Sequence, residues 1–169
     1  ALEDYPGNRQ LLIQNAVLTA LQGHLKEGIV ALRGMISDDE DDLQIYSSMI
    51  NIYQSKRNFE AAQDVLDDAF ERFADNEQVY FMQGAIFEEQ KNYGEAEVAF
   101  RKALEIEADD PAVLNYLGYM LTDNDIKLEE ALEMIQKAVA ADPINGAYLD
   151  SLGWAYYRLN RLELAEQYL

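Results

Sequence analysis

The sequence contains no cysteine and only one histidine, one tryptophan and three prolines among its 169 residues. Without cysteine the chain cannot form disulfides or thiolate metal sites, although the redox compartment stays open. Apolar runs of about 18 residues are also missing, so we expect no segment that spans a membrane. Apolar residues are nevertheless plentiful, at 49% of the chain with 11% aromatic. This content favours a packed fold over a disordered tail.

Positive charge is scarce as well. Thirteen lysines and arginines stand against 32 aspartates and glutamates, which gives a formal net charge of −19. A surface with this balance repels a phosphate backbone, so we expect no nucleic-acid partner. An RNA-binding helical-repeat protein of similar period is disfavoured for the same reason. Only a basic groove in the structure would favour that interpretation again. The acidic balance instead favours partners that carry basic groups.

One pattern of large and small residues occurs twice in the C-terminal third of the chain. The spacing i, i+3, i+4, i+7 places all its members on one face of a helix. A glycine inside a helix costs about 1 kcal/mol relative to alanine, so a glycine in this apolar stripe indicates a helix crossing too close for a Cβ. The two copies, 35 residues apart, are Leu114, Leu117, Gly118 and Leu121, and Leu149, Leu152, Gly153 and Tyr156.

The same scheme extends toward the N-terminus with a period of 34 residues, and one extra residue is placed in the turn over 122–127. Residues 1–8 form a lead-in in which Asn8 is the expected N-cap, and Asp110 with Pro111 predicts another helix start. The first unit matches weakly, with Ala16 and Gly28 in its small-residue slots. The predicted units are 9–42, 43–76, 77–110, 111–145 and a truncated 146–169, which together make one solenoid over 9–169.

The residues of these units resemble the tetratricopeptide repeat family. The family signature is a large apolar residue, a second one three positions on, a small residue next to it, an aromatic, then alanine, a bulky residue and proline. The resemblance covers 9–169 and implies an all-α fold, namely a right-handed α-solenoid of antiparallel helix pairs known as the tetratricopeptide superhelix. The matching residues are Leu114, Leu117, Gly118, Leu121, Ala131, Ile135, Ala138 and Pro143, and Leu149, Leu152, Gly153, Tyr156, Ala165 and Leu169.

The sequence of residues 111–157 also resembles those of bacterial tetratricopeptide proteins of the cell envelope. This likeness implies a periplasmic or outer-membrane-tethered adaptor, while a cytoplasmic location stays possible. Because the chain begins at Ala1 rather than at methionine, we expect it to be a piece of a longer protein in which further units follow.

The resemblance further implies a concave groove, lined by the first helix of each unit on the side opposite the small residue. Aromatic anchors carry much of the binding energy in such surfaces. The implied function is a non-catalytic scaffold or adaptor for a protein or peptide with apolar anchors and basic flanks. The alternative is that the aromatic residues pack on adjacent repeats and bind nothing. The groove residues are Asn51, Phe81, Glu88, Asn115, Tyr119, Asp150, Trp154, Tyr157 and Arg158.

One subclass of the family holds the C-terminal carboxylate of a chaperone tail with several groove lysines and arginines. Here Arg158 is the only basic residue at a predicted groove position, and Asn51 alone does not make such a clamp. We therefore do not expect this activity.

No pattern predicts a catalytic device, a metal site or a cofactor. His24 lies in a turn beside Gly23, which favours a surface loop residue over a member of a catalytic triad. The acidic group over 123–130 lacks the turn glycine and the roughly 12-residue spacing of a calcium loop. The acidic run over 37–42 favours a solvated loop, with a site for a cation or a basic partner as the alternative.

Two other interpretations stay open. The chain could form a homo-oligomer through its truncated C-terminal end. It could also be a regulatory or assembly arm of a larger protein, either enzymatic or anchored in the envelope.

Overall fold

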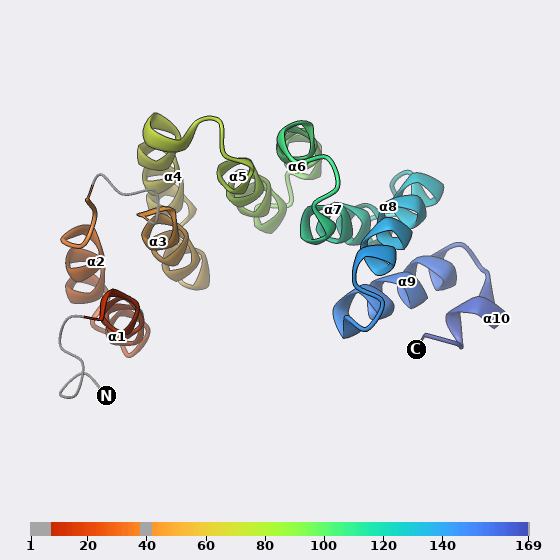
Figure 1. Cartoon of the computed structure of the whole chain (residues 1–169), viewed down its shortest axis with the longest axis horizontal. Coiled ribbons are helices and arrows are strands. Elements are labelled where there is room, and N and C mark those ends of the chain that lie inside the picture. The colour runs from red at the N-terminus through yellow and green to blue at the C-terminus, as the bar shows by residue number, and fades with distance from the viewer. Residues whose placement is uncertain (1–7, 38–41, 169) are drawn as a thin grey trace. The chain divides into compact units, whose positions relative to one another are not determined.

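The structure is a computed structural model that describes residues 8–37 and 42–168. Over these ranges every regular element is a helix and no strand occurs (Figure 1). The helices are α1 (Arg9–Leu21), α2 (Leu25–Arg33), α3 (Leu43–Ser55), α4 (Phe59–Phe73), α5 (Glu77–Glu89), α6 (Tyr93–Ile106), α7 (Pro111–Asp123), α8 (Leu128–Ala141), α9 (Gly146–Arg158) and α10 (Leu162–Ala165).

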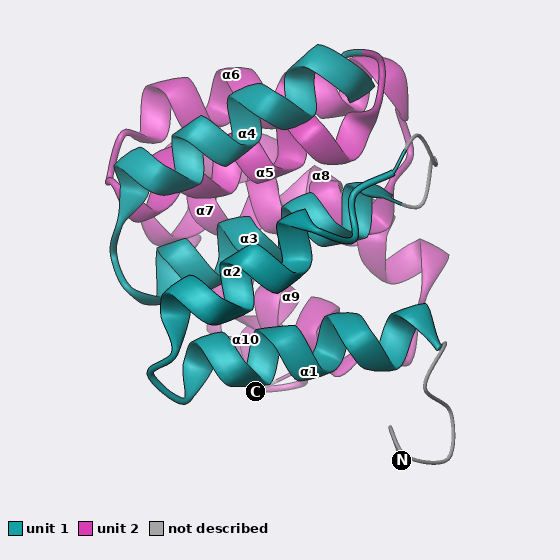
Figure 2. Ribbon diagram, turned by 90° about the vertical axis from the view of Figure 1, so that its left-hand side faces the viewer, with its two compact units in different colours: residues 1–74 teal, residues 75–169 magenta. Residues whose placement is uncertain are grey.

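The chain divides into two compact units, which Figure 2 shows in different colours. Unit 1 (residues 1–74) carries α1 to α4, and unit 2 (residues 75–169) carries α5 to α10. Within each unit, consecutive helices pair as hairpins: α1 with α2 and α3 with α4 in unit 1, and α5 with α6 and α7 with α8 in unit 2. The single solenoid over 9–169 and its repeat boundaries stay a prediction.

Side-chain caps fix several helix starts. The Asn8 side chain accepts a hydrogen bond from the Leu11 backbone N–H at 3.1 Å, and the Asp110 carboxylate accepts one from Val113 at 2.8 Å. Each bond satisfies a donor that the first turn of a helix leaves free. Pro111 occupies the first turn of α7, where its missing N–H costs nothing. Both predicted caps are therefore confirmed.

The hairpin turns share one backbone device. Arg57, Lys91, Asp125 and Asn160 each have a left-handed φ between 55° and 62°. The next residue donates back across the turn, as in the bond from Asn92 N–H to the Phe87 carbonyl at 2.9 Å. The turn between α7 and α8 contains a second left-handed residue at position 127, with φ of 48°. This second left-handed position falls within 122–127, where the sequence places the extra residue, and the repeat register itself stays a prediction.

Small residues let the paired helices approach closely. A Cβ added at Gly28 of α2 would lie 2.5 Å from the Ala16 carbonyl oxygen of α1. A Cβ at Gly118 of α7 would lie 2.9 Å from the Ala131 carbonyl oxygen of α8 and 2.7 Å from Ile135 Cγ1. The predicted close crossing at Gly118 is thus confirmed. It lies against the main core of unit 2, which consists of Ala96, Phe100, Ala103, Val113, Leu117, Met120, Leu121 and Ala131.

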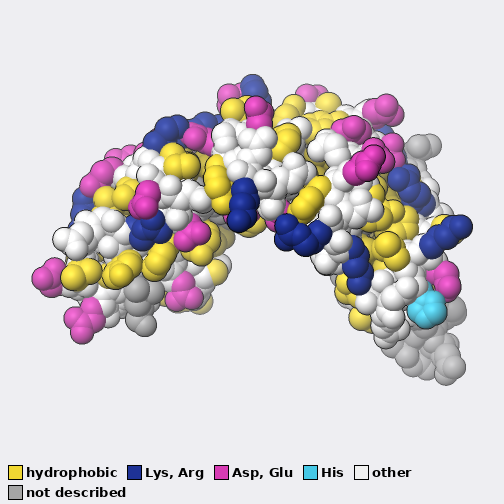
Figure 3. All heavy atoms as spheres, turned by 180° about the vertical axis from the view of Figure 1, so that it is seen from behind, with side chains coloured by type: hydrophobic (Ala, Val, Ile, Leu, Met, Phe, Trp, Pro, Cys, Tyr) yellow, Lys and Arg dark blue, Asp and Glu magenta, His cyan; other side chains and the backbone are white. Residues whose placement is uncertain are grey.

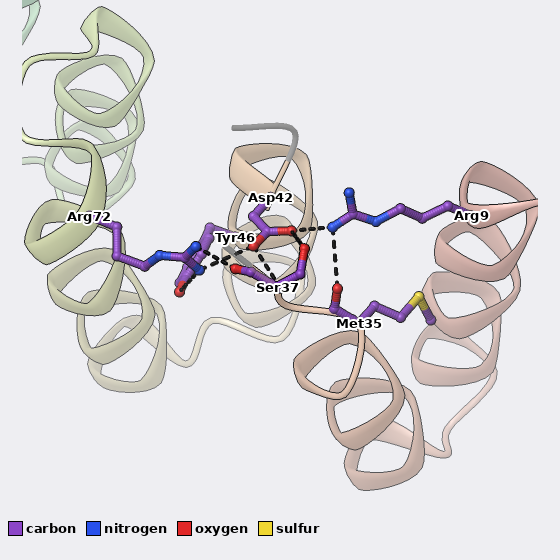
Figure 4. A network of polar contacts seen from close by, with 6 residues as sticks. All are labelled: Arg9, Met35, Ser37, Asp42, Tyr46 and Arg72. Atoms are coloured by element: carbon purple, nitrogen blue, oxygen red, sulfur yellow. Dashed lines mark hydrogen bonds and ion pairs between the residues drawn. The ribbon is translucent and has the colours of Figure 1, made fainter. Parts of the chain in front are cut away.

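A buried carboxylate ties α1 and α4 to the start of α3 in unit 1 (Figure 4). Asp42 has no exposed surface and pairs with Arg9 of α1 and, at 3.2 Å, with Arg72 of α4. It also accepts a hydrogen bond from the Ser37 backbone N–H at 2.7 Å. Burial alone would raise the pKa of Asp42, but these hydrogen bonds and charges outweigh it and lower the pKa below 3.8. The prediction of a solvated loop is therefore wrong at Asp42, and residues 38–41 lie outside the described ranges.

Candidate functional site

An open pocket of about 600 Å³ lies between α7 and α9 in unit 2. Helix α7 contributes residues at i, i+1 and i+4, and α9 contributes residues at i, i+3, i+4 and i+7, so each helix turns one face toward the pocket. None of the described residues that line it is basic. The lining consists of Asn115, Tyr116, Tyr119, Ala147, Asp150, Ser151 and Trp154.

An aromatic cluster supports the α7 side of this pocket. The Tyr116 ring meets the Phe81 ring edge-on at 5.2 Å between centroids and also contacts Phe100 at 5.3 Å. The Tyr116 hydroxyl donates to Glu88 Oε2 at 2.9 Å. Burial and the nearby Glu88 carboxylate raise the pKa of Tyr116, so the phenol keeps its proton. The cluster fixes the orientation of Tyr116 and leaves no free polar group on it.

Two tyrosines beside the pocket remain accessible to solvent. Tyr119 on α7 is 44% exposed, and Tyr157 on α9 is 50% exposed. The Tyr157 ring stacks on the Trp154 ring with centroids 5.3 Å apart and an interplanar angle of 20°. Aromatic side chains held in this way provide a rigid apolar surface that loses little conformational entropy when it binds.

The arginine beside this stack is already neutralised within the chain. The Arg158 guanidinium lies 5.3 Å from the centroid of the Trp154 ring, a cation–π distance. It also donates to the Asp123 carbonyl at 3.0 Å and pairs with the Asp125 carboxylate. Arg158 therefore has little capacity left to bind a carboxylate of a partner.

Two polar atoms of the lining residues are buried without a hydrogen-bond partner among the described residues, namely Asn115 Oδ1 and Trp154 Nε1. Such an atom costs roughly 1–3 kcal/mol of stability while it stays unpaired. Ser151 in the same lining is satisfied, because its hydroxyl donates to the Ala147 carbonyl at 2.9 Å. Unpaired polar atoms in native structures are rare and need an explanation, so the pair in this pocket marks it as a candidate site.

The predicted groove residues separate into three groups. Asn115, Tyr119, Asp150 and Trp154 line the pocket. Phe81 and Glu88 pack beneath it against Tyr116, while Tyr157 and Arg158 flank Trp154. Asn51 is exposed on α3 in unit 1 and is not among the residues that line the pocket. That these residues bind a partner stays a prediction.

The pocket also contains residues that the sequence prediction omitted, namely Tyr116, Ala147 and Ser151. Tyr116 lies next to Asn115 on the wall of the pocket, and its aromatic character was the available signal. Ala147 lies one turn before Ser151 on α9, so its position on the same helical face could have been found from the spacing.

The other groups considered from the sequence, His24 and the acidic group over 123–130, form contacts within the chain. His24 is exposed before α2, and its Nδ1 lies 3.2 Å from Glu27 Oε1. In the acidic group over 123–130, Glu129 and Glu130 pair with Arg161 and Arg101. The described ranges contain no cluster of metal-ligating side chains.

Acidic side chains are spread over both units on the face shown in Figure 3, among basic and hydrophobic ones. None of the helices in the described part of the chain combines the length and hydropathy needed to cross a bilayer.

The helical hairpins, the left-handed turns and the close crossings at small residues define a helical-repeat protein. The family model described as "Tetratricopeptide repeat" matches residues 49–112 and 127–169, and the chain belongs to this family. The predicted all-α tetratricopeptide solenoid class is thereby confirmed. Proteins of this family generally mediate protein–protein interactions.

Among curated proteins, the chain is similar to the TPR repeat-containing protein PA4667 of Pseudomonas aeruginosa. The two are 29% identical over 178 aligned residues, which cover 100% of this chain. The chain spans 30% of the length of that relative.

Several solved structures share the fold. MamA from Desulfovibrio magneticus RS-1 matches with a TM-score of 0.69 and 22% identity, over 96% of this chain and 92% of that one. YrrB, described as a TPR protein with an unusual peptide-binding site, matches with a TM-score of 0.63 and 20% identity, over 98% and 85%. PilW, described as a type IV pilus biogenesis factor, matches with a TM-score of 0.68 and 23% identity, over 74% and 58%. At these identities the likenesses establish the fold alone.

Proposed function

We propose that this chain is a non-catalytic protein-interaction module. In this proposal, the pocket between α7 and α9 and the aromatic side chains beside it bind a segment of a partner protein. The observation that carries the proposal is the pair of exposed tyrosines, Tyr119 at 44% and Tyr157 at 50%, next to an open pocket of about 600 Å³. Pockets of this size with aromatic walls are typical of ligand sites.

The chemistry of the site favours a partner with an apolar anchor and basic groups. Tyr119 and Trp154 supply apolar surface at the pocket, and Asp150 is exposed in its lining. Arg158, which lies over the Trp154 ring, already pairs with Asp125. With a net charge of −19 on the whole chain, basic segments approach faster and acidic ones are repelled.

The test compares two double variants that remove similar exposed side chains from different faces of unit 2. Tyr119→Ala/Tyr157→Ala truncates the aromatics at the site. Val98→Ala/Ile106→Ala truncates apolar residues on α6 that are 56% and 43% exposed. Proteins captured from the source cell are quantified on all three baits, and the affinity of the best purified candidate is then measured directly.

The proposal expects that the tyrosine variant loses the partner by more than tenfold while the α6 variant keeps it, because central aromatic anchors typically contribute about 2 kcal/mol or more each. Equal retention of the same partner by both variants would overturn the role of this site. Circular dichroism and thermal melting confirm that both variants are folded.

A second candidate function is self-assembly. Leu162 and Leu164 on the short helix α10 are 51% and 40% exposed, and exposed apolar surface of this kind supports association of copies. Light scattering over a range of concentrations should then show a rising mass that Leu162→Gln/Leu164→Gln abolishes. A constant monomer mass excludes this function.

The module could also act as the interaction arm of a longer protein. The much greater length of the Pseudomonas aeruginosa relative supports this arrangement. Pull-downs with the full-length protein and with a version lacking these residues test it, since only the former should retain the partner.

A further inference from the structure

The pocket between α7 and α9 contains polar groups that the chain itself does not use. The side chains of Asn115, Tyr119 and Asp150 make no hydrogen bond or ion pair with any described residue, and Trp154 Nε1 is likewise unpaired. Tyr119 also makes no ring contact among those residues. Other polar groups of the lining form hydrogen bonds within the protein, as the Tyr116 hydroxyl does with Glu88. The unused groups therefore share one location.

Two of these groups complement a peptide bond. Asn115 Oδ1 is an acceptor without a donor, and Trp154 Nε1 is a donor without an acceptor. Every peptide backbone offers one N–H and one C=O per residue. A segment seated between α7 and α9 can satisfy both atoms once the two side chains shift toward it, because these helices contribute one atom each to the same pocket.

The other two groups complement a cation. Asp150 supplies an exposed carboxylate, and the Tyr119 ring offers a free aromatic face to which a positive charge is attracted. No basic residue among those described lines the pocket, and Arg158 beside it is held by Asp123 and Asp125. A cation that enters from outside therefore meets no competing positive charge.

We propose that this pocket recognises a lysine or arginine residue of the partner segment. The side-chain cation lies between the Asp150 carboxylate and the Tyr119 ring, and the adjoining peptide group bonds to Asn115 and Trp154. The basic residue is then the anchor of the segment and not merely a flank. This inference rests on the proposed function and adds to it the identity of the anchoring residue.

Blocked pentapeptides test the proposal on the folded chain. The probes carry lysine, arginine or the uncharged isostere norleucine at the centre of four alanines, with an acetylated N-terminus and an amidated C-terminus. Trp154 is the only tryptophan of the chain, so its indole N–H gives one resonance in a proton–nitrogen spectrum. Titration followed by this resonance reports binding at the unpaired donor itself.

The expected result is that lysine and arginine probes bind at least fivefold more tightly than the norleucine probe and move the indole resonance in a saturable manner. Asp150→Asn should reduce this preference by about fivefold, the size expected of one partly exposed ion pair. Glu133→Gln is the matched control, since it removes an exposed carboxylate of α8 outside the pocket and should leave the preference unchanged.

Three results would overturn the inference: equal binding of the norleucine and lysine probes, a preference that survives Asp150→Asn, or an indole resonance that no probe moves. Any of these, combined with loss of the natural partner from the Tyr119→Ala/Tyr157→Ala variant, leaves the proposed function standing and removes only the basic anchor. If that variant also keeps its partner, the proposed function fails together with the inference.

Discussion

The backbone of Gly118 passes so close to the Ala131 carbonyl that a Cβ added at Gly118 would lie 2.9 Å from the oxygen. The neighbour in this contact is backbone of α8, so it cannot move aside without shifting the helix. Space for the crossing of α7 and α8 therefore depends on the absence of one methyl group.

This contact predicts that Gly118→Ala destabilises the protein, by about 1–3 kcal/mol, despite the better helix propensity of alanine. Gly94→Ala is the control, because Gly94 lies near the start of α6 and nothing lies within 4 Å of its added Cβ. That variant should be neutral or slightly stabilising. Urea denaturation of both proteins measures the difference, and equal midpoints would contradict the close crossing.

The buried Asp42 predicts a specific loss of stability in acid. Its pKa is lowered in the folded protein, so the folded state prefers the carboxylate, and the contribution is present above the ordinary pKa of 3.8. It disappears as the pH falls below that value and through the folded pKa. At pH 6, Asp42→Asn should cost about 1–3 kcal/mol, because both arginines lose the ion pair with the Asp42 carboxylate.

The measurement compares the wild-type protein with Asp42→Asn in urea at pH 6 and pH 3. The gap between the two proteins should shrink at pH 3, since this pH lies below the ordinary pKa of 3.8 that the carboxyl has in the unfolded chain. Asp64→Asn, at an exposed position on α4, should show no such gap at either pH. A gap that stays constant with pH would contradict a role for the charge.

The unpaired Asn115 predicts opposite effects on stability and on binding. Replacing an unsatisfied buried polar group by an apolar one of similar shape is nearly neutral or stabilising. Asn115→Leu should therefore keep or raise the melting temperature while it weakens binding of the partner segment. Thermal melting and titration of the same sample test both halves. A destabilised variant with normal binding would show that Asn115 serves the fold.

Ion pairs between side chains of α6 and the residue before α8 predict that the stability of the protein depends on salt. Glu97 pairs with Arg101 at 2.7 Å and with Lys127, and its side chain is only 15% exposed. Burial opposes ionisation, but these two partners lower the pKa of Glu97 overall. Glu97→Gln should cost about 0.5–1 kcal/mol at low salt and less at 1 M salt, where screening is strong. Glu133→Gln serves as the control, and an unchanged cost at high salt would contradict the electrostatic origin.

The helices and their close crossings could be predicted because they depend on short-range spacing. The glycine at position 118 lies within its own apolar stripe, and the caps at Asn8 and Asp110 involve residues three positions away. The groove residues came from the family resemblance, which names the first helix of each unit as the lining, and four of them, Asn115, Tyr119, Asp150 and Trp154, line the pocket. Local spacing was sufficient for the helices, and the resemblance was needed for the groove.

The remaining features depend on contacts between residues far apart in the chain. Asp42 looked like part of a solvated acidic loop, yet Arg9 and Arg72 approach it from two other helices. Arg158 looked like a free groove cation, but Asp123 at the end of α7 and Asp125 in the α7–α8 turn bind it. No spacing rule within one helix anticipates a partner that tertiary packing supplies.

The left-handed turns carry a consequence for protein engineering. Lys91 has a φ of 62° and is exposed, in a conformation that L-amino acids with a Cβ adopt at a cost of roughly 1–2 kcal/mol. Asparagine tolerates it better, so Asn160 has less to gain from exchange for glycine. A glycine at position 91 would relieve that strain and lies outside the lining of the pocket. Single glycine substitutions at strained positions of the hairpin connections should thus raise the thermal stability of the protein without altering the surface proposed for binding.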